Sequence, residues 1–121
     1  MFAVSVPTLI VAVSAPSVAH AADVVRYEVL SGSIASVNVE YAEQTGRTTV
    51  DDVPLPWSLE VTVDQAAGPI GRGAQIRADW RPQARPSQWV SVRILHNGVL
   101  LCQSTLDVGN ATCYGNTPHN S

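Results

Sequence analysis

Apolar and polar side chains alternate with a period of two along most of this chain, and this alternation constrains the fold more than any other feature. The clearest runs span residues 35–41, 57–64, 74–80 and 90–94. A β-strand places successive side chains on opposite faces, so each run offers one face to a core and the other to water. β-branched residues are abundant in these runs, and none of the runs has the i, i+3, i+4 apolar spacing of a helix. The sequence therefore predicts an all-β fold.

Turn-forming residues separate the alternating runs. The main turn signals are Ser31-Gly32-Ser33, Gln44-Thr45-Gly46, Asn97-Gly98 and Asp107-Val108-Gly109-Asn110. Asn97-Gly98 is the strongest of them, because both residue types tolerate the positive φ of a two-residue type I′ hairpin turn. Seven or eight short strands divided by turns predict an immunoglobulin-like antiparallel β-sandwich over residues 22–115. A small β-barrel is the alternative.

The two ends of the chain differ from this domain. Residues 2–19 are almost wholly apolar or small, and Ala19-His20-Ala21 has the small-x-small pattern of a signal-peptidase site. We therefore expect residues 1–21 to be a signal peptide, and the mature chain to be secreted or periplasmic without a transmembrane span. An uncleaved anchor and an apolar first strand remain alternatives. No Lys or Arg precedes the apolar run, so either the chain starts downstream of its true initiator or the leader is atypical. Residues 116–121 are expected to form a flexible tail.

Cys102 and Cys113 are the only cysteines, and an oxidising compartment would allow them to pair. If runs 99–106 and 110–115 fold back about a turn centred between residues 107 and 108, the two cysteines lie directly opposite each other. Facing residues of an antiparallel pair have Cα atoms about 4.5–5.5 Å apart, which a disulfide can span. We therefore expect a cross-strand disulfide in a terminal hairpin. A redox-active pair is not indicated, because the spacing is wide and no helix N-terminus is predicted nearby.

Charge and motif content exclude several classes of function. The chain has 7 basic and 10 acidic residues and a net charge of −3, so it lacks the basic surface of a nucleic-acid-binding protein. It carries no Gly-x-Ser-x-Gly elbow, phosphate-binding glycine loop or metal-ligand spacing. His96 has no identifiable orienting carboxylate, and the adjacent Asp51 and Asp52 would point to opposite faces of a strand. We therefore expect a protein that is not an enzyme and needs neither a cofactor nor a metal.

The segment from Trp80 to Trp89 is the candidate partner-binding surface. Its two Arg-Pro units, at Arg81 and Arg85, favour an extended and exposed loop. Trp80 continues the apolar alternation of the run before it and is expected in the core. Trp89 has the parity of the polar residues that follow it, so we expect it on the polar side. There, an exposed tryptophan near arginines is a typical anchor for a partner. The alternative is that a bulge or loop turns Trp89 inward, or that the second face of the sheet is also covered.

Five segments, in order along residues 24–115, carry a family resemblance. They are Val25-Arg26-Tyr27-Glu28-Val29, Ser36-Val37-Asn38-Val39-Glu40-Tyr41 followed by Gly46, Leu55-Pro56-Trp57-Ser58, Val90-Ser91-Val92-Arg93-Ile94 followed by Asn97-Gly98, and Ala111-Thr112-Cys113-Tyr114-Gly115. With these segments the chain resembles the extracytoplasmic domain of the MmpS family, small mycobacterial membrane proteins that accompany MmpL-type lipid and siderophore exporters. Leu55, Pro56 and Trp57 match the most recognisable motif of that family.

The resemblance implies an immunoglobulin-like sandwich that acts through protein contacts and without catalysis. The chain departs from the family pattern in two ways: Val92 stands where the family has a cysteine, and the domain follows the expected signal peptide almost at once, whereas the family has a transmembrane helix and a spacer before it. We therefore expect an exported, non-enzymatic domain that binds an envelope protein, such as an exporter, or a lipidic ligand. The alternative function is a small-ligand carrier or weak hydrolase, with a cavity between the sheets that holds His96 or an aspartate.

Overall fold

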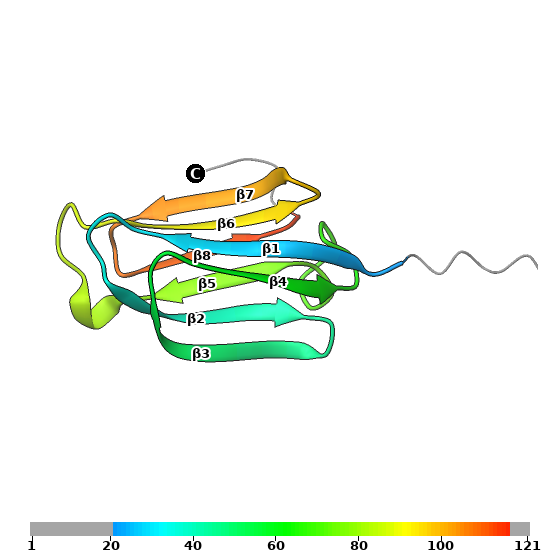
Figure 1. Cartoon of the computed structure of the whole chain (residues 1–121), viewed down its shortest axis with the longest axis horizontal. Helices are drawn as coiled ribbons and strands as arrows, with labels where there is room; N and C mark the ends of the chain where they lie inside the picture. The colour runs from blue at the N-terminus through cyan, green and yellow to red at the C-terminus, as the bar shows by residue number, and fades with distance from the viewer. Residues whose placement is uncertain (1–20, 117–121) are drawn as a thin grey trace, which may run out of the picture.

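Eight β-strands pair into two antiparallel sheets that stack on each other (Figure 1). The computed structural model describes residues 21–116, so the predicted signal peptide and C-terminal tail lie almost entirely outside the described residues. The strands are β1 (Asp23–Leu30), β2 (Ser36–Glu43), β3 (Gly46–Pro54), β4 (Trp57–Val63), β5 (Gln75–Asp79), β6 (Val90–His96), β7 (Val99–Leu106) and β8 (Asn110–Tyr114). A short 3₁₀-helix, η1 (Arg81–Gln83), follows β5. The predicted β-sandwich is confirmed, and the alternative of a closed barrel is wrong.

Each sheet contains four strands. Sheet A has the order β4-β1-β6-β7, and sheet B has the order β3-β2-β5-β8. Within residues 21–116, the hairpins β2–β3 and β6–β7 each stay in one sheet, and the remaining connections cross between the sheets. The β6–β7 hairpin turns at Asn97 and Gly98, whose φ angles of 53° and 76° are both positive, as a type I′ turn requires. The hairpin predicted at this position is confirmed.

The core lies between the sheets and consists of the inward-facing residues of the alternation. In β6, Val90, Val92 and Ile94 are all fully buried, as a period of two predicts. Trp80 directly follows β5 and is only 1% exposed, so its predicted place in the core is confirmed. The largest fully buried side chains are those of Trp80, Tyr27, Ile76, Ile94, Val25, Val29, Val37, Val39, Val63, Val90, Val92 and Cys113.

β3 has fewer buried side chains than its alternating sequence would suggest. It forms one edge of sheet B, and Val53 is its only buried residue. The register between β2 and β3 shifts between Val37 and Val39, and Asp52 adopts a positive φ of 55°. A bulge of this kind bends a strand and increases its local twist. β3 therefore contributes little to the core and presents most of its side chains to water.

The terminal hairpin predicted from the cysteine spacing is wrong, although the predicted disulfide is present. β7 belongs to sheet A and β8 to sheet B, so residues 107–109 form an arch between the sheets. Residues equally distant from the turn still face each other in an arch, but they do so across the core. The Cys102–Cys113 disulfide, with Cα atoms 5.9 Å apart, therefore ties the two sheets together at one edge of the sandwich.

The hydroxyl of Tyr27 makes a second, polar connection between the sheets. This residue of β1 is fully buried, and its hydroxyl donates a hydrogen bond of 2.7 Å to the carbonyl oxygen of Ala42. The same oxygen accepts a hydrogen bond of 3.1 Å from the backbone N–H of Gln75. Both partners belong to sheet B. Burial raises the pKa of Tyr27 to about 12, because the phenolate would lose its hydration in the core.

Folding stability should fall between pH 10 and pH 12, because the unfolded chain releases the Tyr27 proton near pH 10.0 and the folded chain keeps it until about pH 12. In this window the unfolded state binds fewer protons, so the free energy of unfolding decreases as pH rises, by up to about 1.4 kcal/mol per pH unit. Urea unfolding at several pH values measures the slope. Tyr27→Phe should flatten it, whereas the control Tyr114→Phe on β8 should leave it as in the wild type. Equal slopes for all three proteins would contradict this assignment.

Loss of the inter-sheet disulfide should lower the free energy of unfolding by about 3 kcal/mol, the chain-entropy estimate for a closed segment of this length. The double variant Cys102→Ala, Cys113→Ala removes the bond without leaving a free thiol, and urea unfolding against the oxidised wild type measures the loss. A difference below about 1 kcal/mol would mean that the bond does not restrict the unfolded chain as that estimate assumes.

Candidate functional site

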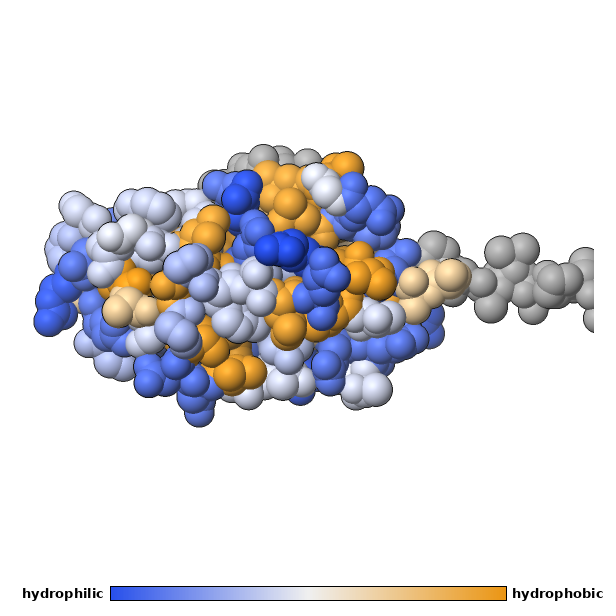
Figure 2. Space-filling view, viewed as in Figure 1, coloured by the Kyte–Doolittle hydropathy of each residue, from blue (hydrophilic) through white to orange (hydrophobic). Residues whose placement is uncertain are grey.

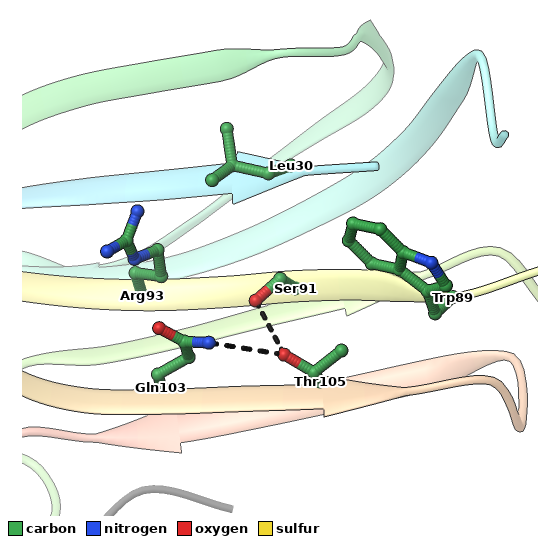
Figure 3. A pocket seen from close by; sticks show the side chains of 6 residues that line it. All are labelled: Leu30, Trp89, Ser91, Arg93, Gln103 and Thr105. Atoms are coloured by element: carbon green, nitrogen blue, oxygen red, sulfur yellow. Dashed lines mark hydrogen bonds between the residues drawn. The ribbon is translucent and has the colours of Figure 1, made fainter. Parts of the chain in front are cut away.

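The candidate site is a hollow of about 440 Å³ on the outer face of sheet A, away from the core. It is lined by Leu30, Trp89, Ser91, Arg93, Gln103 and Thr105 (Figure 3). We call these six residues the Trp89 groove. They come from the end of β1, from β6 and the residue before it, and from β7. In the view of Figure 2, apolar patches lie among polar side chains over the strands of sheet A.

Strand register brings the groove residues together from distant parts of the sequence. Ser91 on β6 lies between Leu30 on β1 and Thr105 on β7, and the next outward residue of β6, Arg93, lies opposite Gln103. Facing residues of an antiparallel pair project from the same face of the sheet. Because the alternate residues of β6 point into the core, these five side chains all project outward.

Trp89 closes one end of the groove, and the guanidinium of Arg93 lies at the other (Figure 3). The Trp89 side chain is 44% exposed, so its predicted exposure on the polar side is confirmed. Its backbone carbonyl accepts a hydrogen bond of 2.7 Å from the hydroxyl of Ser31. A Cβ atom on Gly32 would lie 3.9 Å from the indole, which places the ring beside the β1–β2 loop. Its role as a partner anchor stays a prediction.

The hydroxyl groups on the floor of the groove are satisfied by each other, whereas Nε of Arg93 is buried without a hydrogen-bond partner among the described residues. The hydroxyls of Ser91 and Thr105 are joined by a hydrogen bond of 2.8 Å, and the Gln103 amide donates a further one of 3.4 Å to Thr105. Arg93 lies 3.5 Å from Glu28, the residue opposite it on β1, so its charge is partly balanced. The six lining residues include no histidine or carboxylate that could take a proton from Ser91. The groove therefore offers an aromatic face, neutral hydrogen-bonding groups and the partly balanced charge of Arg93.

Arg81 and Arg85, which we grouped with Trp89 by sequence, are not among the groove residues. Arg81 begins η1 and forms an ion pair of 2.6 Å with Asp79 at the end of β5. Burial alone would raise the pKa of Asp79, but the hydrogen bonds and charge of Arg81, with that of Arg77, outweigh it and hold this pKa below its ordinary value. Arg85 is exposed, and its guanidinium donates to the carbonyl of Ala84. Partner contacts by Arg81 and Arg85 stay a prediction.

Leu55 and Pro56 connect β3 in sheet B to β4 in sheet A, and Trp57 is the first residue of β4. The Leu55–Pro56 peptide bond is cis, and the Leu55 N–H donates a hydrogen bond of 3.0 Å to the carbonyl of Ala35. The Trp57 ring lies 6.0 Å from that of Tyr41 and packs against the core. In this structure the motif therefore occupies a packed sheet-to-sheet connection rather than the groove.

Sequence reasoning missed a carboxylate beside His96. Asp23, at the start of β1, lies 3.7 Å from the imidazole, and its other carboxylate oxygen accepts a hydrogen bond from the Ala66 N–H. The contact follows from the pairing of β1 with β6, which no local signal indicates. His96 lines neither the Trp89 groove nor the second hollow of sheet A, about 330 Å³ near the Asn97-Gly98 turn. Among the described residues, no group of three or more His, Cys, Asp or Glu side chains is arranged to hold a metal ion.

No family model matches the chain, and no curated protein matches it. Within residues 21–116, none of the helices is long and apolar enough to cross a membrane. The similarity to MmpS domains therefore stays an expectation from the motifs.

Thr105→Val should destabilise the fold by about 1–2 kcal/mol, even though residue 105 lies on an outer face. Ser91 is only 4% exposed, and its hydroxyl would lose its partner while remaining shielded from water. Urea unfolding measures the change. The control Thr62→Val, on the outer face of β4, should change stability by less than about 0.5 kcal/mol. Equal effects of the two variants would show that the Ser91–Thr105 bond has no special weight.

Proposed function

We propose that this chain is an exported, non-catalytic domain that binds a protein of the cell envelope through the Trp89 groove. The resemblance to MmpS domains makes an MmpL-type exporter the expected partner, with this chain as an accessory domain outside the cytoplasm. The observation that carries the proposal is the position of Trp89, which is 44% exposed and lies at one end of a groove on the outer face of sheet A.

The chemistry of the groove favours a protein partner. Tryptophan is enriched among residues that dominate binding energy, because burial of its large ring against a partner removes much apolar surface from water. Around Trp89, the charge of Arg93 is partly balanced by Glu28, and the hydroxyls bond to each other. A partner would therefore cover the groove without leaving an isolated charge unpaired.

The disulfide supports a location outside the reducing cytoplasm. Structural disulfides persist in oxidising compartments such as the periplasm and the exterior. Both cysteines are buried and form a link between the sheets, which is a structural position. Export is also what the predicted signal peptide implies.

The alternative of a carrier or hydrolase with a cavity between the sheets receives less support. The largest hollow described above lies on an outer face, and buried apolar side chains occupy the space between the sheets. His96 pairs with Asp23 at the rim of sheet A, and the Trp89 groove contains neither residue. His96 and Asp23, the candidate acid–base pair, therefore lie apart from the Trp89 groove.

Trp89→Ala should weaken binding to an MmpL-type exporter about thirtyfold, which corresponds to about 2 kcal/mol for loss of a central anchor. The measurement is the dissociation constant between the purified chain and the exporter in lipid nanodiscs. Near-ultraviolet circular dichroism checks that the variant remains folded.

Ile70→Ala is the matched control, since Ile70 is an exposed apolar residue far from the groove in sequence and does not line it. It should bind like the wild type. Arg81→Ala and Arg85→Ala then measure whether the neighbouring loop adds to the contact. If Trp89→Ala binds as tightly as the Ile70 control, the groove is not the surface that contacts the exporter.

A further inference from the structure

Positive charge exceeds negative charge at one end of the Trp89 groove. Arg93, the charged member of the six lining residues, lies 3.5 Å from a carboxylate oxygen of Glu28 on β1. The other oxygen of that carboxylate accepts a hydrogen bond of 3.1 Å from Nε of Arg26. One carboxylate is therefore shared by two guanidinium groups, and these three side chains together carry a net positive charge.

Strand pairing fixes which groups lie beside Arg93. Its neighbours across the strands are Glu28 on β1 and Gln103 on β7. Glu60 also projects from this face, but it stands opposite Arg26 on β4, on the far side of β1 from the groove. It lines the second hollow of sheet A. The positive charge at the Arg93 end is therefore a local feature of a chain whose net charge is −3.

Arg93 is shielded enough for this charge to influence what can cover the groove. Its side chain is 33% exposed, and its Nε is buried without a hydrogen-bond partner among the described residues. An occupant of the groove would remove more water from the guanidinium, while Glu28 remains shared with Arg26. Loss of hydration around a partly balanced charge costs free energy unless an opposite charge replaces the water. An occupant that brings a carboxylate is therefore favoured.

The two ends of the groove set the spacing of the groups that an occupant must present. Trp89 offers an exposed aromatic ring at one end, and Arg93 lies at the other (Figure 3). Four residues of extended chain cover about 13 Å, at about 3.3 Å per residue. In an extended peptide, side chains four positions apart also project from the same face. Such a peptide can place an apolar side chain on Trp89 and a carboxylate at Arg93.

The middle of the groove favours a peptide over a hydrocarbon chain. The hydroxyls of Ser91 and Thr105 bond to each other, and each hydroxyl oxygen has two lone pairs that can accept hydrogen bonds. Backbone N–H groups of a peptide can donate to the lone pairs that remain. A hydrocarbon chain would cover the same oxygens and offer no donor in place of water.

We propose that the Trp89 groove binds an extended acidic peptide segment, with an apolar side chain against Trp89 and a carboxylate four positions away that pairs with Arg93. This inference rests on the proposed function, because it names the chemistry of the segment through which an envelope protein would contact the groove. The added carboxylate would continue the alternation of charge from Arg26 through Glu28 to Arg93, so that each guanidinium has a carboxylate beside it.

Titration of the purified wild-type chain with synthetic peptides tests the proposal without an exporter. The probe, acetyl-Leu-Thr-Ser-Thr-Glu-amide, carries its leucine and its carboxylate four positions apart. A second peptide has glutamine in place of glutamate. A third, acetyl-Leu-Thr-Ser-Glu-Thr-amide, has the same composition but puts the carboxylate on the opposite face. Two-dimensional NMR measures the dissociation constants. The probe should bind with a Kd of about 1 mM, and the other two peptides at least about fivefold more weakly.

Charge variants should change the affinity for the probe in opposite directions. Arg93→Gln should weaken binding about tenfold, because the peptide carboxylate loses its charged partner. Glu28→Gln should strengthen binding about threefold, because Arg93 no longer faces a carboxylate within the chain. Arg77→Gln is the matched control, since Arg77 has a similarly exposed side chain, 40% against 33%, and faces Asp79 on sheet B. It should bind like the wild type. Near-ultraviolet circular dichroism checks that each variant is folded.

Several outcomes would overturn the proposal. Equal affinities for the three peptides would do so, as would a probe that does not bind at about 10 mM. A Glu28→Gln chain that binds the probe more weakly than the wild type would also contradict it. Sedimentation with phosphatidylglycerol vesicles tests for a lipid: if the wild type binds vesicles, Arg93→Gln does not, and the peptides fail to bind, then the groove recognises an anionic headgroup instead.

The peptide titration and the exporter measurement fail independently. An exporter that does not bind would leave the peptide affinities unchanged, since no exporter is present in the titration. Conversely, an exporter whose binding is weakened by Trp89→Ala would still support the proposed function if the three peptides bound alike. In that case only the acidic character of the contacting segment would be wrong.

Discussion

Burial of one face of β6 is the constraint on which both the core and the binding surface depend. β6 lies inside sheet A, between β1 and β7, so its backbone is held on both sides. Val90, Val92 and Ile94 are buried in the core. Because successive side chains of a strand point to opposite faces, the intervening residues must lie on the outer face of the sheet. Ser91 and Arg93 must project outward, together with their neighbours on the adjacent strands. A slip of one residue in the register of β6 would turn its core residues outward and its groove residues into the core.

The ties between the sheets have different chemistry at different places. At the β7–β8 edge the tie is covalent, through Cys102 and Cys113. Within the core, Tyr27 adds a pair of hydrogen bonds from sheet A to sheet B. On the opposite side, the Tyr41 and Trp57 rings meet where the chain passes from β3 to β4. The two sheets are thus fixed across their whole width, which keeps the outer face of sheet A in a defined shape.

Local periodicity was sufficient to predict much of this fold. Parity alone placed Trp80 in the core and Trp89 on the outer face, because each belongs to a run whose neighbours fix the direction of its side chain. The Asn97-Gly98 turn was equally accessible, since two positive φ angles restrict the residue types that fit. These features involve residues close together in the chain.

The features that sequence missed all depend on non-local pairing. The sequence spacing of Cys102 and Cys113 puts them opposite each other in a hairpin and in an arch alike. Which of the two forms is decided by the sheet to which β8 belongs. Leu30 reaches the groove, and Asp23 reaches His96, only because β1 pairs with β6. Local patterns carry no information about that pairing, because the intervening strands and loops separate the two segments by more than fifty residues of sequence.

The position of β1 also affects how the chain must assemble as it is made. Its two neighbours in sheet A are β4 and β6, which follow it by several strands in the sequence. A polypeptide that emerges from its N-terminus presents β1 first, with Val25, Tyr27 and Val29 still uncovered. This apolar segment has no strand to pair with until residues 57–63 have appeared, and it is enclosed on its other side only after residue 96. Sheet A can therefore close only late in synthesis, and the earliest strand must be kept from wrong associations until then.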